Sequence, residues 1–227
     1  MVTRADGRMP NQLRELSIEH AVLSRADGSS RFSQRDTSAL TAVYGPAEVK
    51  SSKELLDKAT VQTVFRPKTG LAGVDDHVCE AILRQALEPV IQRTANPRTS
   101  ITVIVQVMHD DGALLACALN SASMALIDAG VPMSAVLAAV TCAWLPAADG
   151  SSERRLLLDP TLEEQTAATS IATFAFESTN QEIVFSSTEG QLTVDEYFYT
   201  IEMAQKAAAN VLAFMRLSLE RKFSKSV

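Results

Sequence analysis

The stretch from Thr99 to Met133, TSITVIVQVMHDDGALLACALNSASMALIDAGVPM, predicts the centre of the fold. Residues 101–107 are apolar at almost every position and rich in valine and isoleucine, which is typical of a strand buried on both faces. A helix is predicted over residues 113–129, because Gly130 and Pro132 follow as stop signals. The turn between this strand and this helix is where α/β proteins usually bind ligands, so we expect a site there.

The composition indicates a folded domain that does not attract nucleic acid as a whole. Of the 227 residues, 46% are apolar, which is ample for a core, and the net charge of −6 leaves only local basic patches for phosphate contacts. The three cysteines are odd in number and lack CxxC spacing, which predicts buried thiols in a reducing compartment. The longest uncharged run, residues 129–148, is interrupted by glycine and proline and predicts a buried strand rather than a membrane span.

The remaining periodicity predicts an α+β fold of mixed sheets layered with helices, with a flexible stretch over 1–12 and a single domain over 13–227. The predicted strands cover 16–25, 30–44 with a bend at Arg35–Asp36, 47–52, 60–64, 135–144, 154–158, 170–176 and 182–187, with a turn at 149–152. The early strands should be mostly antiparallel. The predicted helices cover 75–93, which Pro89 should kink or end early, and 194–224, where Thr193 and Glu196 have the spacing of a capping box.

Several blocks of sequence resemble the RNase PH-like family, in particular core subunits of the eukaryotic RNA exosome. The resemblance covers about residues 13–224 and is carried by RPKTGL (66–71), AILRQ (81–85), PRTSITVIVQV (97–107), DDGALLACALNSASMALIDAGVPM (110–133) and LLLDPT (156–161). It implies a ribosomal protein S5 domain 2-like fold and a six-membered ring of such subunits around a channel for single-stranded RNA. It also implies 3′-to-5′ RNA processing and degradation in the nucleus, nucleolus and cytoplasm, and a homodimer when the chain is isolated.

The same resemblance points to a lost phosphate site. Active members of the family cleave RNA with inorganic phosphate, which a Gly-Gly-Thr-Arg-Thr run holds at a helix N-terminus through its amides and its arginine. The matching positions here, 112–116, read Gly-Ala-Leu-Leu-Ala, so Leu115 stands where the arginine would be and the phosphate contacts are lost at Leu114 and Leu115. A leucine offers no donor and no positive charge, which argues against efficient phosphorolysis.

Four positions match basic RNA-contacting positions of the family. They are Arg66 and Lys68 in the loop after the predicted strand 60–64, His77 in the first turn of the next helix, and Arg98 before the central strand. A few cations can hold phosphodiesters with salt-sensitive affinity, which predicts an RNA contact. The alternative is that Arg66 and Lys68 are solvated loop charges, and a third hypothesis is a nucleic-acid-binding module that works outside any ring.

Asp159 matches a carboxylate of active family members, but the second carboxylate position, six residues on, is Gln165. A residual nuclease, phosphorolytic or metal-dependent, would use Asp159 with Glu163 or Glu164, and would require inorganic phosphate or Mg²⁺; otherwise no cofactor is expected. The alternative is that Asp159 and Pro160 form a turn that caps the following helical turn. The run His109-Asp110-Asp111 could contribute metal ligands beside Asp159, but it also suits a solvated turn, and no metal site is predicted.

Overall fold

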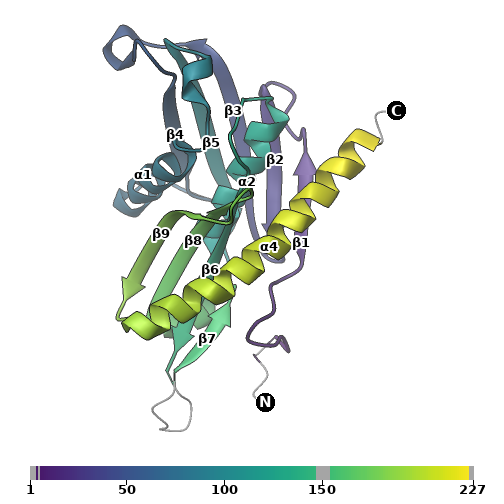
Figure 1. Ribbon diagram of the computed structural model, residues 1–227, viewed down its shortest axis with the longest axis vertical. Coiled ribbons are helices and arrows are strands. Elements are labelled where there is room, and N and C mark those ends of the chain that lie inside the picture. The colour runs from purple at the N-terminus through teal and green to yellow at the C-terminus, as the bar shows by residue number, and fades with distance from the viewer. Residues whose placement is uncertain (1–3, 5, 147–153, 225–227) are drawn as a thin grey trace.

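The computed structural model describes residues 4, 6–146 and 154–224 and contains two β-sheets with one helix between them and other helices packed against them (Figure 1). The first sheet has the order β1-β2-β3-β5-β4 and is formed by β1 (Leu16–His20), β2 (Gly28–Gln34), β3 (Thr37–Glu48), β4 (Thr60–Arg66) and β5 (Thr99–His109). The second has the order β7-β6-β8-β9 and is formed by β6 (Leu137–Leu145), β7 (Arg155–Leu158), β8 (Ser170–Glu177) and β9 (Ile183–Gly190). The helices are α1 (Val74–Leu87), α2 (Leu114–Asp128), α3 (Leu162–Ala167) and α4 (Val194–Ser224), with short 3₁₀ turns at Ser51–Lys53 and Arg93–Ala95. The predicted α+β class is confirmed.

Helix α2 forms the centre of the molecule, because it packs against β2 and β3 of the first sheet and against β6 of the second (Figure 1). Residues 116–126 of this helix are all buried. The polar residues among them form hydrogen bonds to both sheets. Ser121 Oγ donates to Ser30 O at 3.1 Å, while Asn120 Oδ1 accepts from Ala139 N at 2.7 Å and Asn120 Nδ2 donates to Ala139 O at 3.0 Å. Small side chains therefore let the sheets approach α2, and its buried polar groups find partners.

The central strand β5 is buried on one face only, so the prediction of burial on both faces is wrong. Ile101, Val103 and Val105 are at most 1% exposed, whereas the alternate residues Thr102 and Ile104 are half-buried. A strand alternates its side chains between two faces, and this alternation shows that the helices cover one face of the first sheet.

Several predicted boundaries differ from the structure. The strand 16–25 ends at His20, and 30–44 is a hairpin of β2 and β3 because Arg35 adopts a left-handed conformation, φ 53°, in the turn. The strand predicted at 47–52 is wrong, since Ala47 and Glu48 end β3. Strand β4 pairs parallel with β5, because α1 supplies the crossover between them. The turn expected at 149–152 lies outside the described residues.

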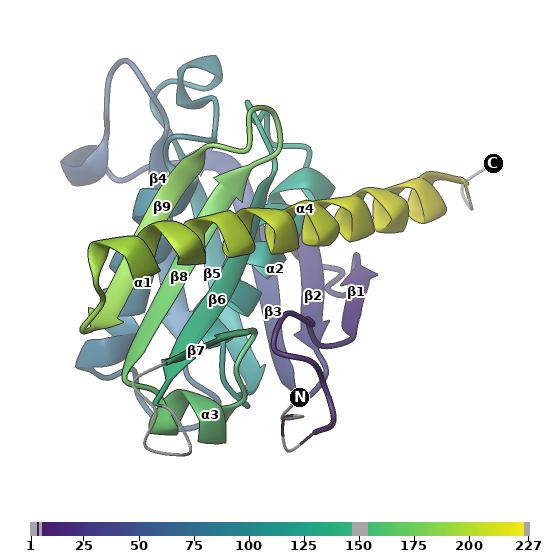
Figure 2. The ribbon, with the colours of Figure 1, turned by 60° about the horizontal axis from the view of Figure 1, so that its bottom comes forward.

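The later elements follow the prediction closely. Strands β8 and β9 pair as an antiparallel hairpin, and α1 ends at Leu87, just before Pro89. Helix α4 crosses the second sheet against β6 and β8 and extends toward β1 (Figure 2). Its start is capped as expected: Thr193 N donates to Glu196 Oε2 at 2.8 Å and Glu196 N donates to Thr193 Oγ1 at 3.3 Å. In the part of the chain that the structure describes, no helix has the length and hydropathy needed to cross a membrane.

Candidate functional site

A pocket of about 510 Å³ opens beside the N-terminus of α2, where the sequence predicts the site. Helices α1 and α2 and the turn before α2 contribute from the first half, and α3 with strands β6, β8 and β9 from the second, so the pocket lies between these helices and the second sheet. Its lining residues are Asp75, Val78, Cys79 and Ile82 of α1, Asp110, Ala113, Leu114 and Leu115 at the start of α2, and Thr141, Leu162, Gln165, Ile171, Thr173, Ser187 and Glu189 of the second half.

The charge of this pocket is negative. Asp75, Asp110 and Glu189 line it, and its described lining contains no lysine, arginine or histidine. Cys79 lies in a similar field, because burial raises the pKa of its thiol and the carboxylates of Asp76, Asp75 and Glu189 raise it further. An inorganic phosphate that entered this pocket would meet carboxylates and no neutralising cation.

The first backbone N–H at the start of α2 is already hydrogen-bonded within the protein. Gly112, with φ 84°, and Ala113, with φ 53°, are both in the left-handed region, and a Cβ at position 112 would lie 2.6 Å from the carbonyl carbon of Thr161. Only glycine fits that position. The N–H of Ala113 donates to Gln165 Oε1 at 3.1 Å, so a side chain of the second half caps this helix where an anion could otherwise bind.

Asp159 is buried behind this turn and is bound by Arg14. Its carboxylate is 2% exposed and accepts from the backbone N and from Nε of Arg14, both at 3.0 Å, and from Nη2 at 2.6 Å. Arg14 also donates to the carbonyls of Asp111 (2.8 Å) and Gly112 (3.0 Å), and to Thr37 Oγ1 (3.1 Å). Burial alone would lower the pKa of Arg14, but the hydrogen bonds and charge of Asp159 outweigh it and raise that pKa. The pair thus fixes the turn before α2.

The N-terminal stretch that was expected to be flexible is anchored over its described part. Arg4 is 8% exposed and donates to Leu158 O (2.7 Å), Asp159 O (2.9 Å) and the carboxylate of Glu164. Arg8 is equally buried and donates to Asp159 O at 3.2 Å. Buried guanidinium groups need several acceptors. The segment from β7 to α3 supplies those of Arg4, whereas Arg8 is bound by Asp6 and Gln12 as well.

The three candidate catalytic carboxylates are therefore not gathered in an open cleft. Asp159 is bound by Arg14, Glu164 is bound by Arg4 and caps α3 through Thr161 N (2.9 Å), and Glu163 is exposed to solvent. Burial raises the pKa of Glu164, but the hydrogen bond and charge of Arg4 outweigh it, so this pKa lies below its ordinary value. The structure also shows the local role left open by the sequence, because the 159–161 turn leads directly into the capped helix α3.

The candidate RNA-binding residues lie at two ends of the first sheet. Arg66 ends β4 and, like Lys68 in the next loop, is exposed; His77, 64% exposed in the first turn of α1, binds Glu80 Oε2 at 2.9 Å. Arg98 precedes β5 and pairs with Glu54 at 3.6 Å. Since β4 and β5 run parallel in register, Arg98 is separated from Arg66 by roughly 20 Å or more of strand.

No metal centre forms among the residues that the structure describes: no three histidine, cysteine, aspartate or glutamate side chains are placed to hold an ion together. Of the run His109-Asp110-Asp111, Asp110 accepts from Gly112 N at 3.0 Å and Asp111 pairs with Arg14 at 3.6 Å. The turn uses its carboxylates to hold its own backbone and the neighbouring arginine.

Three contributors were missed from the sequence. Arg14 follows no motif and its partner is 145 residues away, so nothing local indicated its burial. Glu189 lies on an exposed strand and enters the pocket only through the pairing of β8 and β9. Gln165 was noted as a replaced carboxylate, which was a usable signal, but its capping of α2 was not foreseen.

Comparison with known proteins agrees with this architecture. The model of the 3′ exoribonuclease family matches with its domain 1 over residues 12–132 and with its domain 2 over residues 135–207. The "Exosome complex exonuclease RRP46 homolog" of Arabidopsis thaliana is 36% identical over 99% of both chains, and "Exosome complex component Rrp41" of Archaeoglobus fulgidus is 32% identical over 97% of this chain and 87% of its own. The crystal structure of rice (Oryza sativa) Rrp46 superimposes with a TM-score of 0.88 at 36% identity, covering 96% of this chain and all of that one. The chain therefore belongs to the RNase PH family of 3′ exoribonucleases.

Proposed function

We propose that this chain is a ring subunit of an RNA exosome that supports 3′-to-5′ RNA processing and degradation by assembly and RNA binding, without an efficient phosphorolytic site. The observation that carries the proposal is the pocket at the start of α2. Phosphoryl transfer needs donors and cations around the phosphate, whereas this pocket presents Leu114, Leu115 and three carboxylates. The names of relatives in Arabidopsis, rice and Saccharomyces as exosome proteins support the assembly role.

The test is an RNA-shortening assay with the purified chain. Labelled single-stranded RNA is incubated with and without inorganic phosphate and with and without Mg²⁺, and the wild type is compared with Asp159→Asn. We expect uncut RNA in every lane. Phosphate-dependent shortening by the wild type would refute the loss of the phosphorolytic site.

The second candidate function is a residual metal-dependent or phosphorolytic nuclease that acts through Asp159, with Glu163 or Glu164. It requires a carboxylate that can reach a metal ion or an RNA oxygen. The bonds from Arg14 and Arg4 oppose this, because they occupy two of the three carboxylates. Metal-dependent shortening that disappears in Asp159→Asn while the stability of that variant is unchanged would establish this function instead.

RNA binding is proposed for the cations at the end of β4, Arg66 and Lys68, with His77 beside them. The double variant Arg66→Glu/Lys68→Glu should weaken the binding of single-stranded RNA and flatten its salt dependence, because two phosphate contacts would be lost. Unchanged binding would reject this loop as the contact. Arg98, at the other end of the strand, should act independently of them.

The proposed ring role also predicts how the chain behaves by itself and in the cell. Unpaired sheet edges favour self-association, so we propose a homodimer for the isolated chain, and a monomer at micromolar concentration in light scattering would contradict it. In the cell, imaging of a tagged chain should place it in the nucleus and nucleolus as well as the cytoplasm, together with other RNase PH-like subunits.

A further inference from the structure

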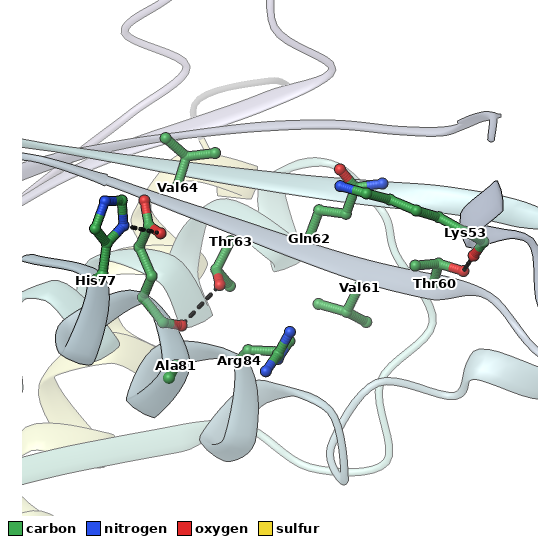
Figure 3. A pocket seen from close by; sticks show the side chains of 10 residues that line it. Lys53, Thr60, Val61, Gln62, Thr63, Val64, His77, Ala81 and Arg84 are labelled. Atoms are coloured by element: carbon green, nitrogen blue, oxygen red, sulfur yellow. Dashed lines mark hydrogen bonds and ion pairs between the residues drawn. The ribbon is translucent and has the colours of Figure 1, made fainter. Parts of the chain in front are cut away.

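The outer edge of β4 borders a second pocket, of about 520 Å³, that runs along the strand (Figure 3). Strand β4 is the last in its sheet and pairs only with β5 among the described strands. Five successive residues, 60–64, line the pocket, together with Lys53 and with His77, Glu80, Ala81 and Arg84 of α1. Successive side chains of a strand point to opposite faces, so a pocket that contacts five in a row follows the edge of the strand.

This edge offers backbone hydrogen-bonding groups. The N–H of Ala59 donates to Arg93 O at 2.8 Å and that of Phe65 donates to Glu80 Oε1 at 3.0 Å, and both acceptors lie outside the sheet. Because a strand repeats every two residues, Val61 and Thr63 direct their N–H and C=O groups to the same outer side. Among the described residues, no group outside the sheet accepts from either N–H. The middle of the edge is therefore open to a new strand.

The lining of this pocket carries two cations, Lys53 and Arg84, against one carboxylate, Glu80. Lys53 and Arg84 are exposed, and no carboxylate of the described residues lies within ion-pair distance of either. The carboxylate of Glu80 is occupied by Phe65 N and by His77 Nδ1 at 2.9 Å. In Figure 3, Lys53 and His77 lie toward opposite ends of the pocket, with Arg84 on the α1 side between them.

We propose that the outer edge of β4 binds an extended acidic segment of a partner protein, which adds to the sheet as a sixth strand. A peptide strand matches the alternating N–H and C=O groups, whereas the outward carbonyls would repel the phosphates of RNA. A second copy of this chain fits less well, because an antiparallel two-fold pairing of β4 would set Arg84 against Arg84, and only Lys53 would meet an opposite charge, the Glu80 carboxylate beside His77. The inference goes beyond the proposed function and holds whether or not the chain binds RNA.

The test uses a blocked peptide that alternates glutamate with valine and threonine, measured by fluorescence anisotropy against the full chain. Lys53→Glu/Arg84→Glu should weaken binding about tenfold, since two cation contacts become repulsive. The matched control, Arg25→Glu/Arg216→Glu, reverses two exposed cations away from β4 and should leave binding unchanged. The same peptide with N-methyl groups along one edge keeps its charge and should not bind. Amide exchange at Val61 and Thr63 should slow when the unmodified peptide is bound.

Three results would overturn the proposal. The first is that the unmodified peptide does not bind, or that the N-methylated peptide binds equally well. Equal binding would show that charge attraction, without backbone pairing, accounts for the affinity. The second is that single-stranded RNA displaces the peptide from the wild-type chain and that RNA binding is lost in Lys53→Glu/Arg84→Glu. That result would assign the edge to RNA. The third is a homodimer that the same double variant dissociates, which would assign it to a second copy. The N-methylated peptide keeps the test decisive if the double variant folds poorly, because that arm uses the wild-type chain.

Discussion

The buried pair of Arg14 and Asp159 predicts a large loss of stability for Asp159→Asn. The substitution keeps the shape of the side chain and removes its charge, so the guanidinium of Arg14, 0% exposed, would keep only the partly exposed carboxylate of Asp111, 3.6 Å away, as a counter-ion. Removing one partner of a buried ion pair costs about 3–5 kcal/mol. An asparagine oxygen at the position of Oδ2 can still accept two of the three bonds from Arg14, those from its backbone N and from Nε. The expected loss therefore lies near the lower end of that range, at about 3 kcal/mol.

Thermal and urea unfolding would measure this loss. For a chain of this size 1 kcal/mol corresponds to about 2–4 °C in Tm, so the Tm should fall by about 6–12 °C. The matched control is Glu163→Gln, which removes the charge of an exposed carboxylate four residues away and should change the free energy of unfolding by less than about 0.5 kcal/mol.

Added metal separates this structural role of Asp159 from a catalytic one. If the carboxylate is a counter-ion for Arg14, Mg²⁺ should not stabilise the wild type more than Asp159→Asn. Unchanged stability of Asp159→Asn, combined with a lost metal-dependent nuclease activity, would refute the reasoning and make Asp159 a functional carboxylate.

Three further variants test the capping and ion-pair contacts. Glu164→Gln should be less stable than the wild type at neutral pH, and this difference should close as the pH falls below 4.5. The bond from Arg4 holds the pKa of Glu164 below that ordinary value, and its stabilisation is lost when the carboxylate is protonated; a difference in the free energy of unfolding that stays constant in acid would contradict this. Gln165→Ala should cost about 1 kcal/mol in urea unfolding, since the N–H of Ala113 loses its acceptor, and no loss would show that water replaces it. Thr193→Ala should cost about 1 kcal/mol through the lost cap of α4, with the decrease visible in helix melting by circular dichroism; an unchanged melt would reject the cap.

The candidate site was only partly predictable from the sequence. The turn before α2 was expected to be the site, and Leu114 and Leu115 do line the pocket there. The negative charge of the pocket was not foreseen, because Asp75 and Glu189 arrive from elements far from α2 in sequence. The placement of Arg98 relative to Arg66 could not be predicted for a related reason, since the parallel register that sets them at opposite ends of β4 and β5 is a tertiary feature.

The sequence by itself determined the local elements of this protein. Helix α2, the end of α1 before Pro89, the β8–β9 hairpin and the cap of α4 at Thr193 all follow from periodicity and from stop and cap signals within a few residues. Such signals depend on neighbours along the chain, and so they can be read without knowing the fold.

Only the tertiary structure decided what surrounds the central strand and the turn that follows it. The single buried face of β5 depends on which side the helices cover, and the role of Asp159 depends on Arg14, 145 residues earlier. The free edge of β4 exists because the chain returns through α1 to place β5 on one side only. These features come from contacts between distant segments, and neither periodicity nor spacing along the chain encodes which segments meet.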